Sequence, residues 1–296
     1  MIVGFGALNL DKIYLVDKIP REDEEGYVID VELHPGGSAA NTIAGLASFG
    51  VKTGYVGKVG SDAEGEMLVE DFRKRGVDLS GIVKSEGRSG QALIFVDRNG
   101  NRAILVDPGV NDTIKFEEVN KELIEKAEIV HMTSFICKNG TDSLESQKKV
   151  AKVAKAVSFD PGLPYVERGL EEIREIVERT TILLPNKTEI EKLVGKDFRE
   201  AAKEMIEEGV KVVAVKLGEK GCYVTDGKEE HFIEAFKANV VDTTGAGDAF
   251  NAGFLYGWMK GKSLEACGKL GNYVASKIVE RVGARNYEGI DPEKFV

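Results

Sequence analysis

The chain has 296 residues, with 40 lysines and arginines against 50 aspartates and glutamates, so its formal net charge is −10. This acidic balance lacks the basic face that a nucleic-acid site needs, and no stretch approaches the ~20 apolar residues of a membrane span. With 42% hydrophobic and 30% charged residues, the composition is that of a globular protein and not of a disordered one. We therefore expect a globular protein with neither a nucleic-acid nor a membrane partner.

The N-terminal segment and the cysteines indicate the cellular compartment of the protein. The segment MIVGFGALNL has no basic region and no cleavage site, so it does not resemble a signal peptide. Cys137, Cys222 and Cys267 are odd in number and far apart, which is typical of reduced thiols. These features predict a cytoplasmic protein.

Short β-branched runs alternate with helical patterns along most of the chain. Strands are predicted at residues 2–8, 53–58, 128–132, 157–160, 181–184 and 210–217, and helices at 38–49, 63–75, 141–156 and 167–178. Ser61 with Glu64 predicts a capping box before the second helix. This alternation implies parallel strands joined by crossover helices. After residue 218 we expect antiparallel strands at 222–225 and 231–235, then helices at 246–259 and 263–281.

Two segments interrupt the alternation. Residues 11–33 are acidic and include a short alternating run near 28–33, and residues 91–107 place QALIFV and RAILV on either side of an Asn-Gly turn. Such a turn between apolar runs is a strong hairpin signal. The pattern predicts either an ordinary surface hairpin or a small β lid beside the main sheet.

Glycine accounts for 34 residues, more than average, and one cluster is Asp242-Thr243-Thr244-Gly245-Ala246-Gly247-Asp248. A Gly-Ala-Gly turn that opens a helix leaves backbone N–H groups free and accessible, which attracts phosphate. Asp248 could merely complement the helix dipole. Two acids on either side of an anion-binding loop instead favour a phosphoryl-transfer site.

A second glycine cluster, Gly36-Gly37-Ser38-Ala39-Ala40-Asn41, also enters a helix. Paired glycines allow a ligand to approach the backbone closely. The alternative is a tight loop in which Ser38 caps the helix.

Together the two clusters resemble the signatures of the ribokinase-like carbohydrate kinases, the PfkB family. A Gly-Gly motif ending in Asn and an Asp-Thr-Thr-Gly-Ala-Gly-Asp motif are both intact and in order, and residues 186–189 match the family's Asn-x-x-Glu element. The resemblance covers essentially the whole chain. It implies one domain, 1–296, with a three-layer α/β/α fold, a mostly parallel central sheet and a small projecting β lid formed by segments at about 12–34 and 88–107.

The resemblance also implies roles for residues on the acceptor side. Asp248 is similar to the catalytic base that accepts the proton of the attacking hydroxyl, with Gly245, Ala246 and Gly247 as the anion hole. The acceptor hydroxyls would be held by Asn9, Asp11, Gly37, Asn41 and, as a weaker match, Asn111.

On the nucleotide side, the resemblance implies ATP as the phosphoryl donor and Mg²⁺ as a cofactor. Asn186 and Glu189 would organise Mg²⁺ and its waters, and Asp242 with the Thr244 carbonyl would correspond to a monovalent-cation site, often K⁺, completed by carbonyls near Gly283. The residues that resemble the nucleotide-side loop and base pocket are Lys216, Gly218, Gly221 and Asn272.

Competing motifs are incomplete. Residues 4–9 lack the third glycine of a dinucleotide site, residues 257–263 are one residue short of a Walker loop and indicate a helix break, and residues 36–40 lack the last glycine of a hydrolase elbow. His34, His131 and His231 have no metal-ligand spacing, so we expect surface or core roles for them.

Several alternatives remain open from the sequence. The acceptor could be a free sugar, a nucleoside or a sugar phosphate, with Arg102 or Lys138 as a ligand for a second phosphate, and the donor could be ADP. A sugar or nucleotide sensor without activity, or a nicotinamide-dependent oxidoreductase, would belong to other classes. Exposed lid strands could pair two subunits in a homodimer.

Overall fold

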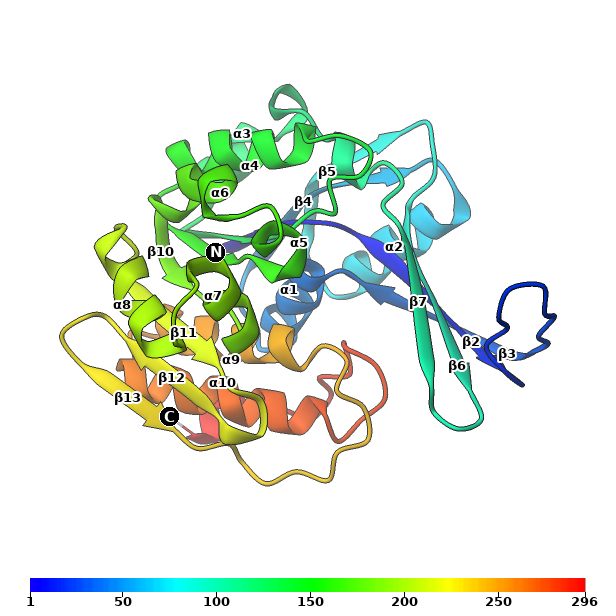
Figure 1. The fold of residues 1–296 in the computed structure, drawn as a ribbon. Coiled ribbons are helices and arrows are strands. Elements are labelled where there is room, and N and C mark those ends of the chain that lie inside the picture. The colour runs from blue at the N-terminus through cyan, green and yellow to red at the C-terminus, as the bar shows by residue number, and fades with distance from the viewer. Residues whose placement is uncertain (296) are drawn as a thin grey trace.

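The structure is a computed structural model that describes residues 1–295. A nine-stranded sheet runs through the body of the molecule in the order β13-β12-β11-β10-β9-β8-β1-β4-β5 (Figure 1). Pairing is parallel from β5 to β11, and β12 and β13 join antiparallel. The strands are β1 Ile2–Phe5, β4 Thr53–Gly60, β5 Asp78–Ser85, β8 Ile129–Thr133, β9 Val157–Asp160, β10 Thr180–Leu183, β11 Val212–Lys216, β12 Cys222–Thr225 and β13 Glu230–Ile233.

Helices cover both faces of this sheet, which makes three layers. One face carries α1 Ser38–Ser48, α2 Ala63–Lys74, α9 Ala246–Met259 and α10 Leu264–Ile278, which share a hydrophobic core. The other carries α3 Lys121–Lys126, α4 Asp142–Val153, α5 Gly162–Val166, α6 Leu170–Val177, α7 Lys187–Val194 and α8 Phe198–Glu207, which share a second core. Short 3₁₀ turns lie at Asn111–Thr113, Phe116–Glu118, Gly218–Lys220 and Pro292–Phe295.

Alternation along each strand explains the two cores. In β1, Val3 and Phe5 belong to one core and Ile2 to the other, and all three are fully buried. A strand buried on both faces must be apolar throughout, which is why these strands appear as continuous hydrophobic runs in the sequence. The expected three-layer fold with a mostly parallel central sheet is therefore confirmed.

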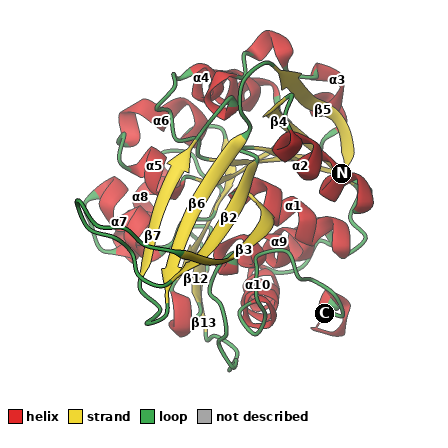
Figure 2. Ribbon diagram, turned by 90° about the vertical axis from the view of Figure 1, so that its right-hand side faces the viewer, coloured by secondary structure: helices red, strands yellow, loops and turns green. Residues whose placement is uncertain are grey.

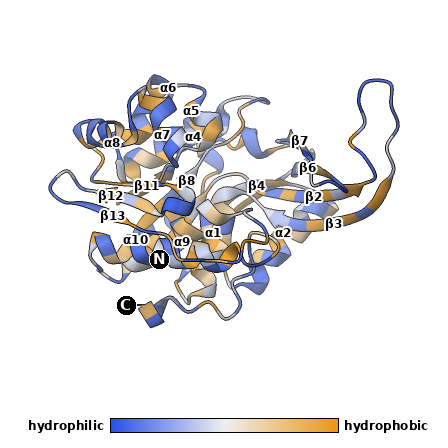
Figure 3. Ribbon diagram, turned by 60° about the horizontal axis from the view of Figure 1, so that its bottom comes forward, coloured by the Kyte–Doolittle hydropathy of each residue, from blue (hydrophilic) through white to orange (hydrophobic). Residues whose placement is uncertain are grey.

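A second, four-stranded sheet projects from the body, with the order β3-β2-β6-β7 (Figure 2). It consists of β2 Asn9–Val16, β3 Val28–Gly36, β6 Gly90–Asp97 and β7 Arg102–Asp107, and β2 pairs with β6 in parallel. Orange stretches in Figure 3 mark apolar residues on β2 and β3 where they leave the body. Whether this sheet closes over a substrate is a prediction, and we call it the lid sheet below.

Several local predictions were wrong. The sequence patterns identified neither β2 nor β5, because both mix charged and apolar residues without clean alternation. The capping box at Ser61 does not form: Asp62 is the N-cap of α2 and accepts from the Gly65 amide at 2.8 Å. Asp62 also accepts from the Ser89 backbone and hydroxyl, so tertiary contacts select it over Ser61.

The predicted helix break at residues 257–263 is confirmed. The chain breaks between α9 and α10, where Gly261 has φ +68°. All three cysteines are free. Among the described residues, no helix combines the length and the apolar character needed to cross a bilayer.

Candidate active site

Asp248 lies in the first turn of α9 and is held by two side chains from α1. The Ser38 hydroxyl donates to Oδ1 at 2.6 Å, and the Asn41 amide donates to Oδ2 at 2.8 Å. Burial raises the pKa of Asp248 to about 6, and these two hydrogen bonds partly oppose that rise. Such a carboxylate is oriented, partly desolvated and able to accept a proton near neutral pH.

The glycine loop before Asp248 presents free amides. Gly245 is the N-cap of α9 in the left-handed conformation, with φ +76°. The Ala246 amide donates to the Thr243 carbonyl at 3.2 Å. Within residues 1–295 the amides of Gly245, Gly247 and Asp248 have no acceptor from the protein. A helix N-terminus with unpaired N–H groups attracts an anion, so Gly245 and Gly247 are better donors than Ala246.

The start of the lid sheet supplies polar groups close to Asp248. The Asn111 amide donates to the Leu8 carbonyl and to Asn9 Oδ1, and its Oδ1 accepts from the Leu8 amide. Both ends of the Asn111 amide are therefore used in hydrogen bonds to Leu8 and Asn9, and they hold the Asn9 side chain in place. Burial raises the pKa of Asp11 to about 6, while Arg285 and His34 oppose the rise.

Glycines 36 and 37 are required where the two sheets meet. A Cβ on Gly36 would lie 2.4 Å from Asp11 Oδ2, and one on Gly37 would lie 2.2 Å from the Ala7 carbonyl. Gly37 also has φ +101°, a conformation that other residues rarely adopt. Any side chain at either position would displace a backbone or a carboxylate that lines the site.

A buried charged cluster lies beside the glycine loop on the side away from the lid sheet. Lys216 donates to Asp160 at 2.5 Å, and the Asn251 amide donates to the same oxygen at 2.7 Å. Burial disfavours the Lys216 ammonium, but Asp160 and Glu189 more than compensate and raise its pKa. Its Nζ is 3.5 Å from the position of a Cβ on Gly247, so the ammonium, although paired with Asp160, lies close to the position of a phosphate bound by the loop.

Asn186 and Glu189 form a reciprocal cap at the start of α7. Asn186 accepts from the Glu189 amide at 2.9 Å, and Glu189 accepts from the Asn186 amide at 2.7 Å. Burial and the charge of Asp160 raise the pKa of Glu189 to about 7. One oxygen of Glu189 is used by the cap, and the rise in its pKa comes chiefly from burial.

Asp242 links the glycine loop to the segment after α10. Its two oxygens accept from the amides of Thr244 at 2.9 Å and Gly283 at 3.0 Å. Although burial opposes ionisation, these amides lower the pKa of Asp242. The carboxylate is thus ionised, and each of its oxygens accepts a backbone N–H group.

The remaining predicted nucleotide residues lie around the turn after β11 and beside the backbone that follows β13. Gly218 and Gly221 have φ +62° and +93° around a 3₁₀ turn after β11. A Cβ on Gly221 would lie 1.9 Å from the Ile233 carbonyl. Asn272 is buried and donates to the carbonyls of Ile233 and Glu234, so its amide supports the backbone that follows β13.

Sequence reasoning missed four residues that touch these groups: Ser38, Asp160, Asn251 and Arg285. Ser38 was weighed only as a helix cap, yet Gly37 is the N-cap of α1 and Ser38 contacts Asp248. Asp160 could have been found, because it ends a buried parallel strand, where ligand sites form in such sheets. Asn251 and Arg285 carry no local signal.

His131 lies in the core, where its Nε2 has no hydrogen-bond partner within residues 1–295, and His34 and His231 are partly exposed. His131 is fully buried against Ser158, and burial lowers its pKa to about 4. His34 and His231 pair with the neighbouring glutamates 32 and 229. Among residues 1–295, no three His, Cys, Asp or Glu side chains form a group able to hold a metal by themselves.

Comparisons with known proteins identify the family of this chain. A family model described as pfkB family carbohydrate kinase matches residues 1–289. A protein of Archaeoglobus fulgidus described as an uncharacterized sugar kinase is 56% identical over 241 residues, covering 81% of this chain and 96% of its own length. An ATP-dependent ribose-1-phosphate kinase of Halopiger xanaduensis is 31% identical, covering 96% of this chain and 94% of its own.

A solved structure agrees over the whole fold. The crystal structure of ribokinase from Thermotoga maritima superimposes with a TM-score of 0.88 at 31% identity, covering 100% of this chain and 98% of that one. The family match spans both glycine loops, the Asn186 cap and Asp248. The chain therefore belongs to the pfkB family of carbohydrate kinases and is a phosphotransferase with an alcohol group as acceptor.

Proposed function

We propose that this protein transfers the γ-phosphoryl group of ATP to a hydroxyl of a small sugar such as ribose or a ketohexose, with Asp248 as catalytic base. The observation that carries the proposal is the convergence at Asp248. Its carboxylate is held by Ser38 and Asn41 from the acceptor side, and it directly follows the unpaired amides of Gly245 and Gly247.

In the proposed reaction the protein forms no covalent bond to the substrate. The acceptor hydroxyl oxygen attacks the γ-phosphorus, its proton passes to Asp248, and the bond to the bridging oxygen breaks to release ADP. The transition state is loose, so the protein contributes mainly position and charge. The amides of Gly245 and Gly247 face the transferring group, and Lys216 adds positive charge beside it.

The donor set fits Mg²⁺ without a dedicated protein cage. Mg²⁺ keeps several waters and binds through one or two carboxylates plus phosphate oxygens. Glu189, with Asp160 beside it, offers that chemistry, and the raised pKa of Glu189 is consistent with a place for a cation. When bound, Mg²⁺ would neutralise phosphate charge. Asp242 with the Thr244 carbonyl is the proposed K⁺ site, because Asp242 keeps a negative charge at the glycine loop.

A free sugar is favoured as the acceptor by the charges at this end of the site. Asp11 and Asn9 offer hydrogen bonds to hydroxyl groups, and a carboxylate repels a phosphate. A phosphorylated acceptor would therefore be disfavoured beside Asp11 when this carboxylate is ionised.

A sugar phosphate remains the second candidate because of Arg102. In the strand register Arg102 pairs with Val96, which puts it on the lid-sheet face that carries Asn9 and Asp11. Its charge contributes to lowering the pKa of Asp242, so it lies toward the glycine loop. A relative is described as a ribose-1-phosphate kinase, which makes this alternative worth testing directly.

We also propose that two subunits pair through the outer face of the lid sheet. By register this face carries Tyr14, Val31, Leu33, Phe95 and Leu105. Tyr14 stacks on Phe95 with 5.3 Å between ring centroids, and Val31, Leu33 and Leu105 are 43%, 44% and 62% exposed. Exposed apolar surface of this kind marks an interaction site.

A coupled assay tests the function. Purified protein is offered free pentoses, ketohexoses, keto-deoxy acids, nucleosides and ribose phosphates, with ATP and ADP as separate donors. We expect a free sugar and ATP to give the highest kcat/KM, and Asp248→Asn to lower kcat by ~10²–10⁴-fold, the usual contribution of a positioned base.

Other outcomes would identify the alternatives. Preference for a ribose phosphate that falls on Arg102→Ala would support the sugar-phosphate kinase. Full turnover by Asp248→Asn on the best acceptor would show that another group is the base. Binding of sugar and nucleotide without any turnover would indicate a sensor.

A further inference from the structure

Three consecutive residues after α10 contact both glycine loops of the site. The Gly283 amide donates to Asp242, and Ala284 packs so closely on Gly245 that a Cβ there would lie 2.4 Å from its own Cβ. The third residue, Arg285, reaches the other loop and donates to the Gly36 carbonyl at 2.7 Å. One short segment thus joins the two halves of the site.

Arg285 is buried, with only 8% of its surface exposed. Besides Gly36 it has two side-chain partners: Nε donates to Asn41 Oδ1 at 2.7 Å, and a terminal nitrogen contacts Asp71 at 2.5 Å. Its guanidinium also lies over the Phe72 ring, 5.3 Å from the centroid. These contacts hold the guanidinium in one place and leave it little freedom to turn.

The contact with Asn41 determines which way that amide faces. A guanidinium has donors only, so it must meet the oxygen of Asn41 and not its nitrogen. The nitrogen is then on the side of Asp248, to which it donates at 2.8 Å. Turning the amide over would bring donor against donor at Arg285 and oxygen against carboxylate at Asp248, and both contacts are unfavourable.

We propose that Arg285 is a positioning residue that fixes the Asn41 amide and thereby holds Asp248 as an oriented, ionised base. This inference rests on the proposed function of Asp248 and extends it to a residue that touches neither the carboxylate nor the transferring group.

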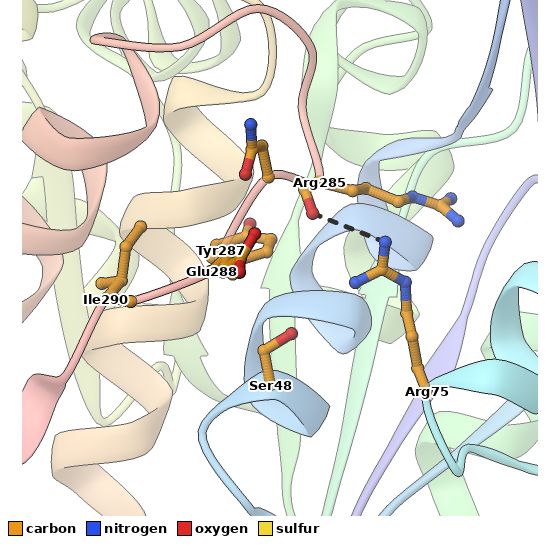
Figure 4. A pocket seen from close by; sticks show the side chains of 8 residues that line it. Ser48, Arg75, Arg285, Tyr287, Glu288 and Ile290 are labelled. Carbon is orange, nitrogen blue, oxygen red and sulfur yellow. Dashed lines mark hydrogen bonds between the residues drawn. The ribbon is translucent and has the colours of Figure 1, made fainter.

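The surroundings offer a matched control. Arg75 contacts the same carboxylate as Arg285, with 3.0 Å between its Nε and Asp71 Oδ1, and donates to the Arg285 carbonyl at 3.4 Å. Figure 4 shows Arg75 and Arg285 beside a pocket of about 410 Å³ at the end of α1. Arg75 shares this environment and this partner but makes no hydrogen bond to Asn41 among residues 1–295.

Other charged and titratable groups also influence Asp248, and the test must leave them in place. They are Asp160 on β9, Lys216 on β11, Glu189 on α7, Asp11 on β2, Tyr55 on β4 and Tyr287 after α10. Neither Arg285→Met nor Arg75→Met removes any of these groups, so a difference between the two variants reports on the Asn41 contact.

The test measures the titration of Asp248 without substrate. Protein with ¹³C-labelled aspartate carboxyls is titrated by NMR, and the Asp248 signal is identified by its loss in Asp248→Asn. We expect Arg285→Met to raise the Asp248 midpoint by about one pH unit, as loss of a hydrogen bond to a carboxylate should, and Arg75→Met to leave it unchanged. In the Asn41→Leu background, Arg285→Met should add no further shift.

Activity provides a second readout. In Arg285→Met, kcat should fall about tenfold below pH 6 and approach the wild-type value above pH 8, because the fall follows the ionisation of Asp248. An unchanged Asp248 midpoint in Arg285→Met, or an equal shift in Arg75→Met, would overturn the inference. If Arg285→Met does not fold, Arg285→Lys replaces it. The lysine ammonium can pair with Asp71, but the side chain cannot reach Asn41 at the same time. We therefore expect the same rise in the Asp248 midpoint.

The two proposals can fail separately. If the wild-type protein phosphorylates no acceptor, the proposed function fails while the NMR titration still measures the link between Arg285 and Asp248. If turnover is normal and the titration does not move, only the positioning role of Arg285 is lost.

Discussion

At the scale of single residues, the site combines groups whose protonation is set by burial. Asp248 and Asp11 have pKa values raised to about 6, and Glu189 to about 7, each chiefly by desolvation. Raised carboxyl pKa values are common where an enzyme needs a base near neutral pH. Keeping such groups buried opposes folding whenever they are ionised, so the site should cost stability at neutral pH.

This cost should be visible in Asp248→Asn. An acid whose pKa is higher in the folded state than in the unfolded state loses stability as pH rises from about 4 to about 6. The asparagine cannot ionise, and its amide can donate to Ser38 and accept from Asn41. We expect its free energy of unfolding, relative to wild type, to rise by about 2 kcal/mol between pH 4 and pH 7, measured by urea denaturation.

The comparison needs only the two proteins in the same buffers, because all other carboxyls are shared. A stability difference that is the same at pH 4 and pH 7 would contradict a raised pKa for Asp248.

At the scale of elements, the start of α9 depends on the packing of Gly245 against Ala284. The sequence of the glycine loop alone does not reveal this contact. Gly245 and Gly261, at the two ends of this helix, have similar positive φ values of +76° and +68°. A Cβ on Gly245 would overlap Ala284, whereas a Cβ on Gly261 would meet nothing within 4 Å. The two positions therefore share the same backbone cost and differ in packing.

Replacing each glycine by alanine should separate these effects. We expect Gly261→Ala to lower the free energy of unfolding by about 1 kcal/mol, the cost of a left-handed alanine. Gly245→Ala should cost about 1–3 kcal/mol more because of the overlap, and should reduce kcat as the amides turn away from the phosphoryl group. Equal losses of stability in urea denaturation would show that Ala284 moves aside freely.

Neighbouring residues of β6 lie on opposite faces of the lid sheet, so a single substitution can test each face. By register, Ile94 lies on the face of Asn9 and Asp11, and Leu93 lies on the outer face. If the inner face closes over the acceptor and excludes water, Ile94→Ser should raise the acceptor KM about tenfold and increase ATP hydrolysis without acceptor. Leu93→Ser should change neither quantity, and equal effects of the two variants in steady-state kinetics would argue against a lid.

At the scale of the whole molecule, several exposed apolar residues lie together on the lid sheet. The proposed pairing of two subunits would cover those on its outer face, Val31, Leu33 and Leu105.

The mass in solution tests this pairing. We expect sedimentation velocity to give about twice the 32.2 kDa of one chain. Leu105→Asp should shift the protein to the monomer, because a charge would be buried between subunits. Val153→Asp on α4 is the control, since Val153 and Leu105 are both 62% exposed. A monomeric wild-type protein, or dissociation by both variants, would contradict the proposed interface.

Much of the architecture could be predicted from local patterns. The parallel strands and the helices between them follow from apolar runs and periodicity, and the boundaries of β9, β12 and α9 were predicted to the residue. The hairpin at 91–107 followed from its Asn-Gly turn, and β6 and β7 lie on either side of that turn. In contrast, β2 and β5 were missed because their pairing partners, and not their own sequences, make them strands.

The sequence by itself determined the class of the protein, because glycine loops and acids at a helix start are local features that need no partner to be recognised. Only the tertiary structure decided how the site is held. Ser38 and Asn41 meet Asp248 across more than 200 positions of the chain, and Arg285 meets Asn41 across 244. No local pattern encodes such contacts, since they exist only where α1, α9 and the segment after α10 pack together.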